Sequence, residues 1–137
     1  MARIMAIDYG TKRTGLAVTD PMQIIASPLA GVRSHDLIEY LQDYLRREEV
    51  ETVVLGYPLN DDEERTHNTG PVEAFANRFR KVFPDHELVF QDEWSTSKLA
   101  VQSMIKAGTR KKQRRDKLAV DQVSATIILQ SYLESRE

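Results

Sequence analysis

Three acidic residues stand where a carboxylate could take part in chemistry. Asp8 ends the apolar run RIMAID, and Glu93 follows shortly after a second apolar run, ELVFQ. Asp121 lies among small and apolar residues at helical spacing, where a charge is costly without a partner or a metal ion. Taken singly, Asp8 could start a turn and Glu93 could be a surface acid near a helix N-terminus. Taken together, the three acids predict a site built from separate elements.

Carboxylates from separate elements are suited to holding divalent metal ions. Mg²⁺ prefers oxygen ligands and tends to keep several of its waters. Two such ions about 4 Å apart can activate an attacking water and stabilise the leaving oxygen of a phosphodiester, without any protein nucleophile. We therefore expect Asp8, Glu93 and Asp121 to bind one or two Mg²⁺ or Mn²⁺ ions and to be the catalytic residues of a phosphodiester hydrolase.

Two basic segments could bind the phosphates of such a substrate. The loop YGTKRTG places Lys12 and Arg13 near Asp8, and its glycines permit a close backbone approach. The segment 106–117, KAGTRKKQRRDK, supplies the further nucleic-acid-binding candidates Arg110, Lys111, Lys112, Arg114 and Arg115. A solvated charged loop is the alternative for that segment. The net charge of −2 does not exclude a polyanion, because the acids lie elsewhere in the chain.

The composition restricts the classes of protein to which the chain can belong. Its 137 residues fit one domain, 1–137, with ordinary hydrophobic (41%) and charged (29%) fractions. The absence of cysteine excludes disulfides, thiolate zinc sites and cysteine nucleophiles. No run approaches the roughly 18 apolar residues of a membrane span, and we find no secretory signal pattern. We expect a cytoplasmic protein with no membrane partner.

The elements that must position the acids follow from the hydrophobic spacing. Five runs have the character of strands: residues 3–8, 14–19, 24–32, 52–55 and 87–91. A turn-rich segment joins the first two runs, which predicts an antiparallel hairpin. Pro28 interrupts the third run and indicates an irregular or edge strand.

Helical spacing appears between and after these strands. Helices are expected from Ser34, from Pro71 to just before Pro84, from Ser95 or Thr96 to about Ala107, and from about Asp116 to Glu134. The inward face expected for the last helix consists of Val120, Val123, Ser124, Ile127 and Leu133. The order β-β-β-α-β-α-β-α-α predicts an α/β fold with a mixed five-stranded sheet flanked by helices. RNase H-like proteins have the same order of elements.

Four blocks of sequence carry a resemblance to a known family. They are AIDYGTKRTGLAVTD (6–20), VVLGYPLN (53–60), QDEWSTSKLA (91–100) and KLAVDQVSATIILQSYL (117–133). In content and order they resemble the motifs of the YqgF family, also called RuvX. That family is associated with Holliday junction resolution and with the processing of pre-16S rRNA.

The resemblance implies an RNase H-like fold and a metal-dependent nuclease. By motif position, Asp8 is the acid of the first strand, Glu93 the acid after the last strand, and Asp121 the acid of the helix. Lys12 and Arg13 match the basic pair of the opening motif, which faces phosphate.

The third block both matches the family and departs from it. Thr96 matches a hydroxyl position after the DE pair. Trp94, however, stands where the family usually has arginine, and an indole cannot replace the charge-assisted bonds of a guanidinium. The segment after Gly56, YPLNDDEERTHNTG, is also acidic where the family commonly has an Asp-Gly turn. These acids would repel a nucleic-acid backbone if they faced the site.

The leading hypothesis is a metal-dependent endonuclease that acts on structured nucleic acid, with 5′-end processing of precursor 16S rRNA as its role. The choice of RNA follows from the family resemblance. One alternative is a Holliday junction resolvase that uses the same acids on branched DNA. The other is a nucleic-acid-binding protein with weak or no nuclease activity, which Trp94 favours. We expect a monomer or a weak homodimer, and a resolvase would require the dimer because two symmetric cuts need two sites.

Overall fold

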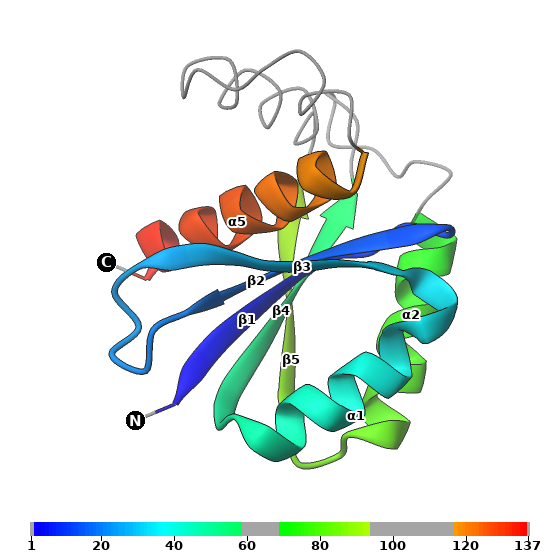
Figure 1. Cartoon of the computed structure of the whole chain (residues 1–137), viewed down its shortest axis with the longest axis horizontal. Coiled ribbons are helices and arrows are strands. Elements are labelled where there is room, and N and C mark those ends of the chain that lie inside the picture. The colour runs from blue at the N-terminus through cyan, green and yellow to red at the C-terminus, as the bar shows by residue number, and fades with distance from the viewer. Residues whose placement is uncertain (1, 59–68, 94–116, 137) are drawn as a thin grey trace.

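The computed structural model describes residues 2–58, 69–93 and 117–136, which form a sheet covered by helices on both faces (Figure 1). The strands are β1 (Arg3–Asp8), β2 (Arg13–Thr19), β3 (Ala26–Arg33), β4 (Val50–Pro58) and β5 (Glu87–Glu93). Their order across the sheet is β3-β2-β1-β4-β5. β2 is antiparallel to both β1 and β3, whereas β4 runs parallel to both β1 and β5. The predicted mixed five-stranded sheet is confirmed.

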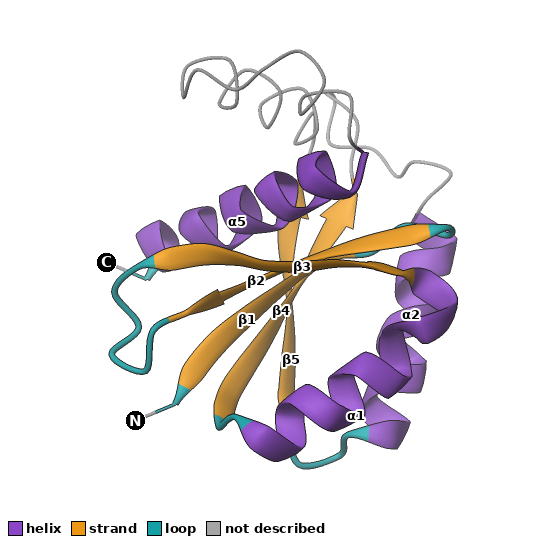
Figure 2. Cartoon of the chain, in the orientation of Figure 1, coloured by secondary structure: helices purple, strands orange, loops and turns teal. Residues whose placement is uncertain are grey.

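The helices lie on opposite faces of this sheet (Figure 2). A short 3-10 turn, η1 (Ser34–Asp36), leads into α1 (Leu37–Arg47), and α1 and α2 (Thr69–Val82) cover one face. The other face is covered by α5 (Lys117–Ser135), close to the bounds predicted for the last helix. The helix expected to end near Ala107 lies outside the described residues. None of the described helices combines the length and apolar character needed to cross a lipid bilayer.

The alternation of side chains along β1 decides which face each residue joins. Met5 and Ile7 are fully buried in the core that contains residues of α1 and α2. Ile4 and Ala6 are almost fully buried in the second core, beneath α5. Asp8 follows Ala6 by two positions, so it belongs to the α5 face at the C-terminal end of β1.

The predicted edge strand is also confirmed. In β3, Pro28 lies opposite Ala17, next to an irregularity in the register between Leu16 and Ala17. Proline has no amide hydrogen to donate to a ladder, so it is tolerated at sheet edges and bulges. The strand itself begins at Ala26, two residues later than the extended run suggests.

Several boundaries and the buried face of α5 differ from the sequence prediction. α2 begins two residues before Pro71, and β4 extends beyond residues 52–55 at both ends. Three residues expected to face inward are only partly buried: Val120, Val123 and Ile127. The buried face consists of Ser124, Ala125, Ile128, Leu129 and Leu133. The prediction was right for Ser124 and Leu133 and wrong for the other three, because apolar residues surround most of α5 and their spacing does not select one face.

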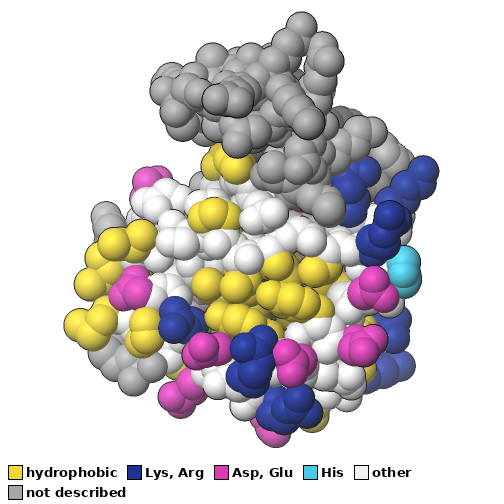
Figure 3. All heavy atoms as spheres, in the orientation of Figure 1, with side chains coloured by type: hydrophobic (Ala, Val, Ile, Leu, Met, Phe, Trp, Pro, Cys, Tyr) yellow, Lys and Arg dark blue, Asp and Glu magenta, His cyan; other side chains and the backbone are white. Residues whose placement is uncertain are grey.

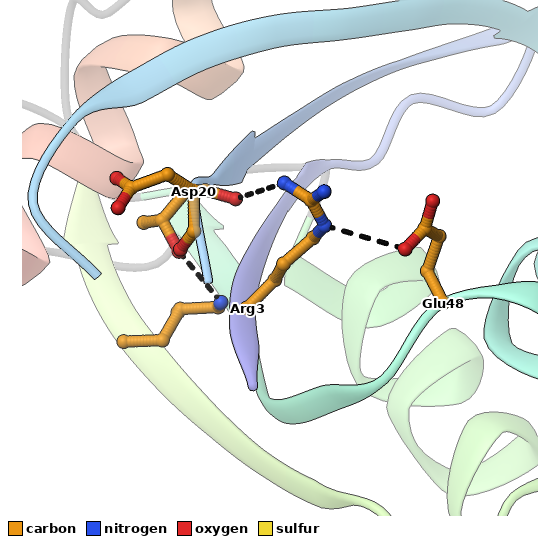
Figure 4. A network of polar contacts seen from close by, with 5 residues as sticks. Arg3, Asp20 and Glu48 are labelled. Carbon is orange, nitrogen blue, oxygen red and sulfur yellow. Dashed lines mark hydrogen bonds and ion pairs between the residues drawn. The ribbon is translucent and has the colours of Figure 1, made fainter. Parts of the chain in front are cut away.

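Polar contacts close the end of the sheet opposite Asp8 (Figure 4). Arg3 donates from Nη1 to the carbonyl oxygen of Thr19 at 3.0 Å, and its Nε lies 3.6 Å from Oε2 of Glu48. The Thr19 hydroxyl accepts from the backbone N–H of Ile4 at 2.9 Å and donates to the carbonyl of Asp20 at 2.8 Å. These bonds fasten the start of β1 to the end of β2.

Asp20 organises the loop between β2 and β3. Its carboxylate accepts from the backbone N–H groups of Met22 (3.0 Å), Ile24 (2.9 Å) and Ile25 (2.7 Å). Gln23, between them, has a φ of 60°, which non-glycine residues seldom adopt. The loop therefore presents Met22, Ile24 and Ile25 with exposed fractions of 60%, 66% and 64%. Apolar side chains gather on the left side of Figure 3, where this loop lies.

Candidate functional site

Gly15 brings the strand acid and the helix acid together. In the ladder between β1 and β2, Gly15 is the register partner of Asp8. A Cβ atom on Gly15 would lie 1.9 Å from the backbone carbonyl oxygen of Asp121 and 2.9 Å from the backbone nitrogen of Gln122. Atoms cannot approach so closely, so a residue without a side chain is needed where α5 crosses β2. Asp8 and Asp121 therefore converge on one position of the sheet.

Arg13, the first residue of β2, forms an ion pair with Asp121. Its Nε lies 2.9 Å from Oδ2 of Asp121, and the exposed fractions of the two side chains are 37% and 15%. The contact is an electrostatic one, since this Nε makes no hydrogen bond of good geometry with the residues that the structure describes. Arg13 thus neutralises a mostly buried carboxylate, a role that the sequence did not suggest.

Ser34 of η1 fixes the glycine loop that carries Lys12. The Ser34 hydroxyl donates to the carbonyl of Gly10, and its oxygen lies 2.8 Å from the hydroxyl oxygen of Thr14. Because the single proton of Ser34 is used on Gly10, Thr14 is the donor in that second bond. The backbone N–H of Ser34 also donates to the carbonyl of Lys12 at 3.0 Å. The loop is therefore held at several points along its length.

Sequence reasoning missed Thr14 and Ser34. Thr14 is fully buried, and a hydroxyl in an apolar strand is a signal that a polar partner should be sought. Ser34 stands at the start of a helical segment, where serine is commonly a cap. In the structure no side-chain cap bond is made at η1, and the Ser34 hydroxyl binds the loop instead.

Glu93 ends β5 at the same edge of the sheet at which Asp8 ends β1. The parallel registers join Ile7 to Leu55 and Pro58 to Glu93, so β1, β4 and β5 all end at this edge. Two strand spacings separate β1 from β5, which corresponds to roughly 10 Å. Only the backbone of Glu93 is described, and its side chain lies outside the described part of the chain.

Basic residues surround the loop between β1 and β2. Lys12 is exposed in the loop, and Arg33 is exposed at the end of β3, where it is the register partner of Arg13. Lys and Arg side chains lie along the right side of Figure 3, where this loop is found. Cations beside a carboxylate site suit an anionic substrate. The remaining predicted nucleic-acid-binding residues lie outside the described residues: Thr96, Arg110, Lys111, Lys112, Arg114 and Arg115.

Comparison with known proteins places this chain in a family. The family model described as RuvX, Holliday junction resolvase, matches residues 2–135. The chain belongs to the RuvX family. The resemblance that the four sequence blocks suggested is thereby confirmed.

RuvX-family relatives match over nearly their whole length. A protein of Christiangramia forsetii is 50% identical over 133 residues, which cover 97% of this chain and 98% of the relative. A protein of Phocaeicola vulgatus is 47% identical over 137 residues, which cover 100% of this chain and 99% of the relative. Both bear the name "Putative pre-16S rRNA nuclease".

A solved structure supports the fold of this RuvX-family chain. T. thermophilus RuvC, in complex with a Holliday junction substrate, superposes with a TM-score of 0.53 at 15% sequence identity. The match covers 99% of this chain and 96% of RuvC. The predicted RNase H-like fold is confirmed.

The donors at this candidate site fit a divalent cation. Asp8 and Asp121 supply carboxylate oxygens, which Mg²⁺ and Mn²⁺ prefer as ligands. The guanidinium of Arg13 already lies 2.9 Å from Asp121, so a positive charge is accommodated at this carboxylate. Within the described residues no group of three His, Cys, Asp or Glu side chains is close enough to hold a metal ion. Glu93, the third predicted ligand, is described only in its backbone.

Proposed function

We propose that this chain is a metal-dependent endonuclease that hydrolyses phosphodiester bonds in structured nucleic acid. The convergence of Asp8 and Asp121 on Gly15, at the edge of the sheet where β5 ends, is the observation that carries the proposal. Asp8, Asp121 and Glu93 are the proposed catalytic residues and the ligands of Mg²⁺ or Mn²⁺. The bound metal would supply an activated water and a Lewis acid for the leaving oxygen.

The chain's own basic residues would hold the substrate in place. Lys12 projects from a loop that Ser34 fixes at Gly10 and at the Lys12 carbonyl, so its charge is presented from a defined backbone. Arg13 would bind phosphate from the start of β2. Thr96 and the basic residues of segment 106–117 are proposed as further contacts to the substrate. Because such contacts release counterions, binding should weaken steeply with salt.

Precursor 16S rRNA, cut at its 5′ end, is the proposed substrate. The names of relatives that are 47–50% identical over nearly the whole chain support this choice. Such a protein would act in the cytoplasm, and one active site would suffice, so that a monomer or a weak homodimer is proposed.

Resolution of four-way DNA junctions is the second candidate, favoured by the description of the RuvX family model. Two symmetric cuts would require two copies of the site and hence a two-fold dimer. Oligomeric state on the substrate therefore separates the two candidates.

The test uses a precursor 16S RNA fragment and a four-way DNA junction, each with Mn²⁺, Mg²⁺ or EDTA. Wild type is compared with Asp8→Asn, Glu93→Gln and Asp121→Asn. Asp43→Asn is the matched control, because Asp43 is an exposed acid of α1 that pairs with Arg46 and Arg47. We expect wild type and Asp43→Asn to cut the RNA when Mn²⁺ or Mg²⁺ is present. The three acid variants should not cut it.

The other outcomes decide between the alternatives. If the protein cuts only the junction and needs the same three acids to do so, its function is junction resolution. Absence of cutting on both substrates, together with binding that persists in EDTA and in all three acid variants, would refute the nuclease and leave a nucleic-acid-binding protein.

A further inference from the structure

We propose that Arg13 is a placeholder cation that couples metal binding at Asp121 to phosphate binding by the loop between β1 and β2. The inference rests on the proposed function, because it takes Asp121 as a metal ligand. Arg13 would neutralise Asp121 while no metal is bound and turn to the substrate phosphate once the carboxylate holds a metal ion. Metal and nucleic acid would then strengthen each other's binding.

Arg13 and a metal ion would compete for one oxygen atom of Asp121. Nε of Arg13 and Oδ2 of Asp121 are both buried and lie 2.9 Å apart. A metal ion bound at Oδ2 would lie only about 2 Å from that oxygen. A guanidinium and a divalent ion so close to each other would repel strongly at a site shielded from water. Arg13 must therefore leave Oδ2 when this oxygen takes a metal ion.

The side chain of Arg13 can move while its backbone stays fixed. Its backbone is fixed in β2, paired with Arg33, and the neighbouring Thr14 is bonded to Ser34. Its side chain is 37% exposed, and its Nε contacts Asp121 without the geometry of a hydrogen bond. The side chain can consequently exchange partners while the strand stays in place.

A guanidinium released from Asp121 would find a second anion beside Lys12. Arg13 is the chain neighbour of Lys12, which is exposed in the loop between β1 and β2. A guanidinium binds a phosphate through two parallel N–H bonds, an interaction that competes well with a single carboxylate contact. A substrate phosphate held by Lys12 would therefore offer Arg13 a second anion close to the first.

Exchange of this kind has a thermodynamic signature. If metal releases Arg13 for phosphate, metal raises the affinity for nucleic acid, and nucleic acid raises the affinity for metal by the same factor. Removing the guanidinium should therefore tighten metal binding in the absence of nucleic acid and abolish the coupling. A purely structural role for Arg13 predicts the opposite change in metal affinity, because Asp121 would lose the residue that positions it.

The first experiment measures Mn²⁺ binding to the full chain without nucleic acid, by electron paramagnetic resonance. Arg13→Gln should bind Mn²⁺ roughly fivefold more tightly than wild type, the scale expected from the loss of one partly exposed ion pair. Lys12→Gln removes the same charge from the neighbouring position and should change the affinity less than about twofold. Arg13→Lys keeps a cation and should stay close to wild type. Asp121→Asn should lose most of the binding.

The second experiment measures the affinity for a precursor 16S RNA fragment with Ca²⁺ and with EDTA. Wild type should bind the RNA more tightly with Ca²⁺, whereas Arg13→Gln should bind it equally in both. Circular dichroism melting of each variant shows whether it is folded. Arg13→Lys keeps the positive charge at this position, so it should bind the RNA more tightly with Ca²⁺, as wild type does.

Two failures can be told apart. If wild type binds Mn²⁺ and Asp121→Asn does not, but Arg13→Gln binds no more tightly than wild type, the placeholder role is overturned and the metal site stands. If neither wild type nor Arg13→Gln binds Mn²⁺, or if Asp121→Asn binds it as well as wild type, the proposed metal site itself is refuted.

Discussion

The backbone of Asp121 rests directly on Gly15. A side chain of even one carbon at position 15 would overlap the Asp121 carbonyl, at 1.9 Å from its oxygen. The same glycine is the ladder partner of Asp8, so a single residue that neighbours both acids sets the distance between the sheet and the helix. The geometry of the site therefore depends on a residue that has no functional group.

Replacing Gly15 by alanine should displace α5 from the sheet. Forcing one carbon into such a contact typically lowers the free energy of unfolding by about 1–3 kcal/mol. Because Asp121 would move with its helix, nuclease activity should fall by roughly 100-fold, more than the loss of folded protein explains. Urea unfolding and single-turnover cleavage of the RNA fragment measure the two effects.

Gly70→Ala is the matched control for this prediction. Gly70 lies in the first turn of α2, and a Cβ there would meet no atom within 4 Å. Alanine should leave the free energy of unfolding unchanged or raise it by up to about 1 kcal/mol, since alanine is the better helix former. Equal effects of the two substitutions would show that the close contact at Gly15 is unimportant.

Replacing Ser34 by alanine should loosen the loop that carries Lys12. The carbonyl of Gly10 and the hydroxyl of Thr14 would both lose their bond to Ser34, and Thr14 is fully buried. Loss of such bonds costs about 1–3 kcal/mol in the free energy of unfolding. Affinity for RNA should fall as well, measured by filter binding. Ser27→Ala, at an exposed position of β3, should stay within about 0.5 kcal/mol of wild type.

Asp20 should make the stability of the loop between β2 and β3 sensitive to acid. The N–H of Ile25 foremost, with those of Ile24 and Met22, holds the pKa of the Asp20 carboxyl below its usual 3.8. A lowered pKa in the folded state means that the charged form contributes stability above pH 3.8, and this is lost as the pH falls through the folded-state pKa.

The measurement compares urea unfolding of wild type and Asp20→Asn at pH 7 and near pH 3. Wild type should be the more stable protein at pH 7, and the difference should shrink at the lower pH, which lies below the usual carboxyl pKa of 3.8. A difference that stays constant over this range would mean that the charge of Asp20 does not hold the loop.

Divalent metal should stabilise the folded protein if Asp8 and Asp121 are ligands. Mn²⁺ at 100 times its dissociation constant would add about 2.7 kcal/mol to the free energy of unfolding and raise the melting temperature, and EDTA should reverse the gain. Asp8→Asn and Asp121→Asn should lose this gain, whereas Asp43→Asn should keep it. An identical shift in all four proteins would point to unspecific binding of Mn²⁺.

The strands could be predicted well because their signal is local. Short apolar runs bounded by turn residues identified all five, and Pro28 indicated the edge strand, since a residue without an N–H cannot serve in the middle of a sheet. The buried face of α5 could not be predicted in the same way. Apolar residues occur around most of that helix, and which of them are buried depends on the sheet beneath it.

The sequence by itself determined the family, the order of elements and the acids that are candidate metal ligands, because residue type and spacing along the chain carry that information. Only the tertiary structure decided that Gly15 lies between Asp8, its ladder partner, and the backbone of Asp121. It also decided that Arg13 pairs with Asp121 and that Ser34 fixes the glycine loop. Each of these contacts links residues far apart in the chain or on different elements. Their formation depends on strand register and on how closely α5 packs, and neither leaves a local trace in the sequence.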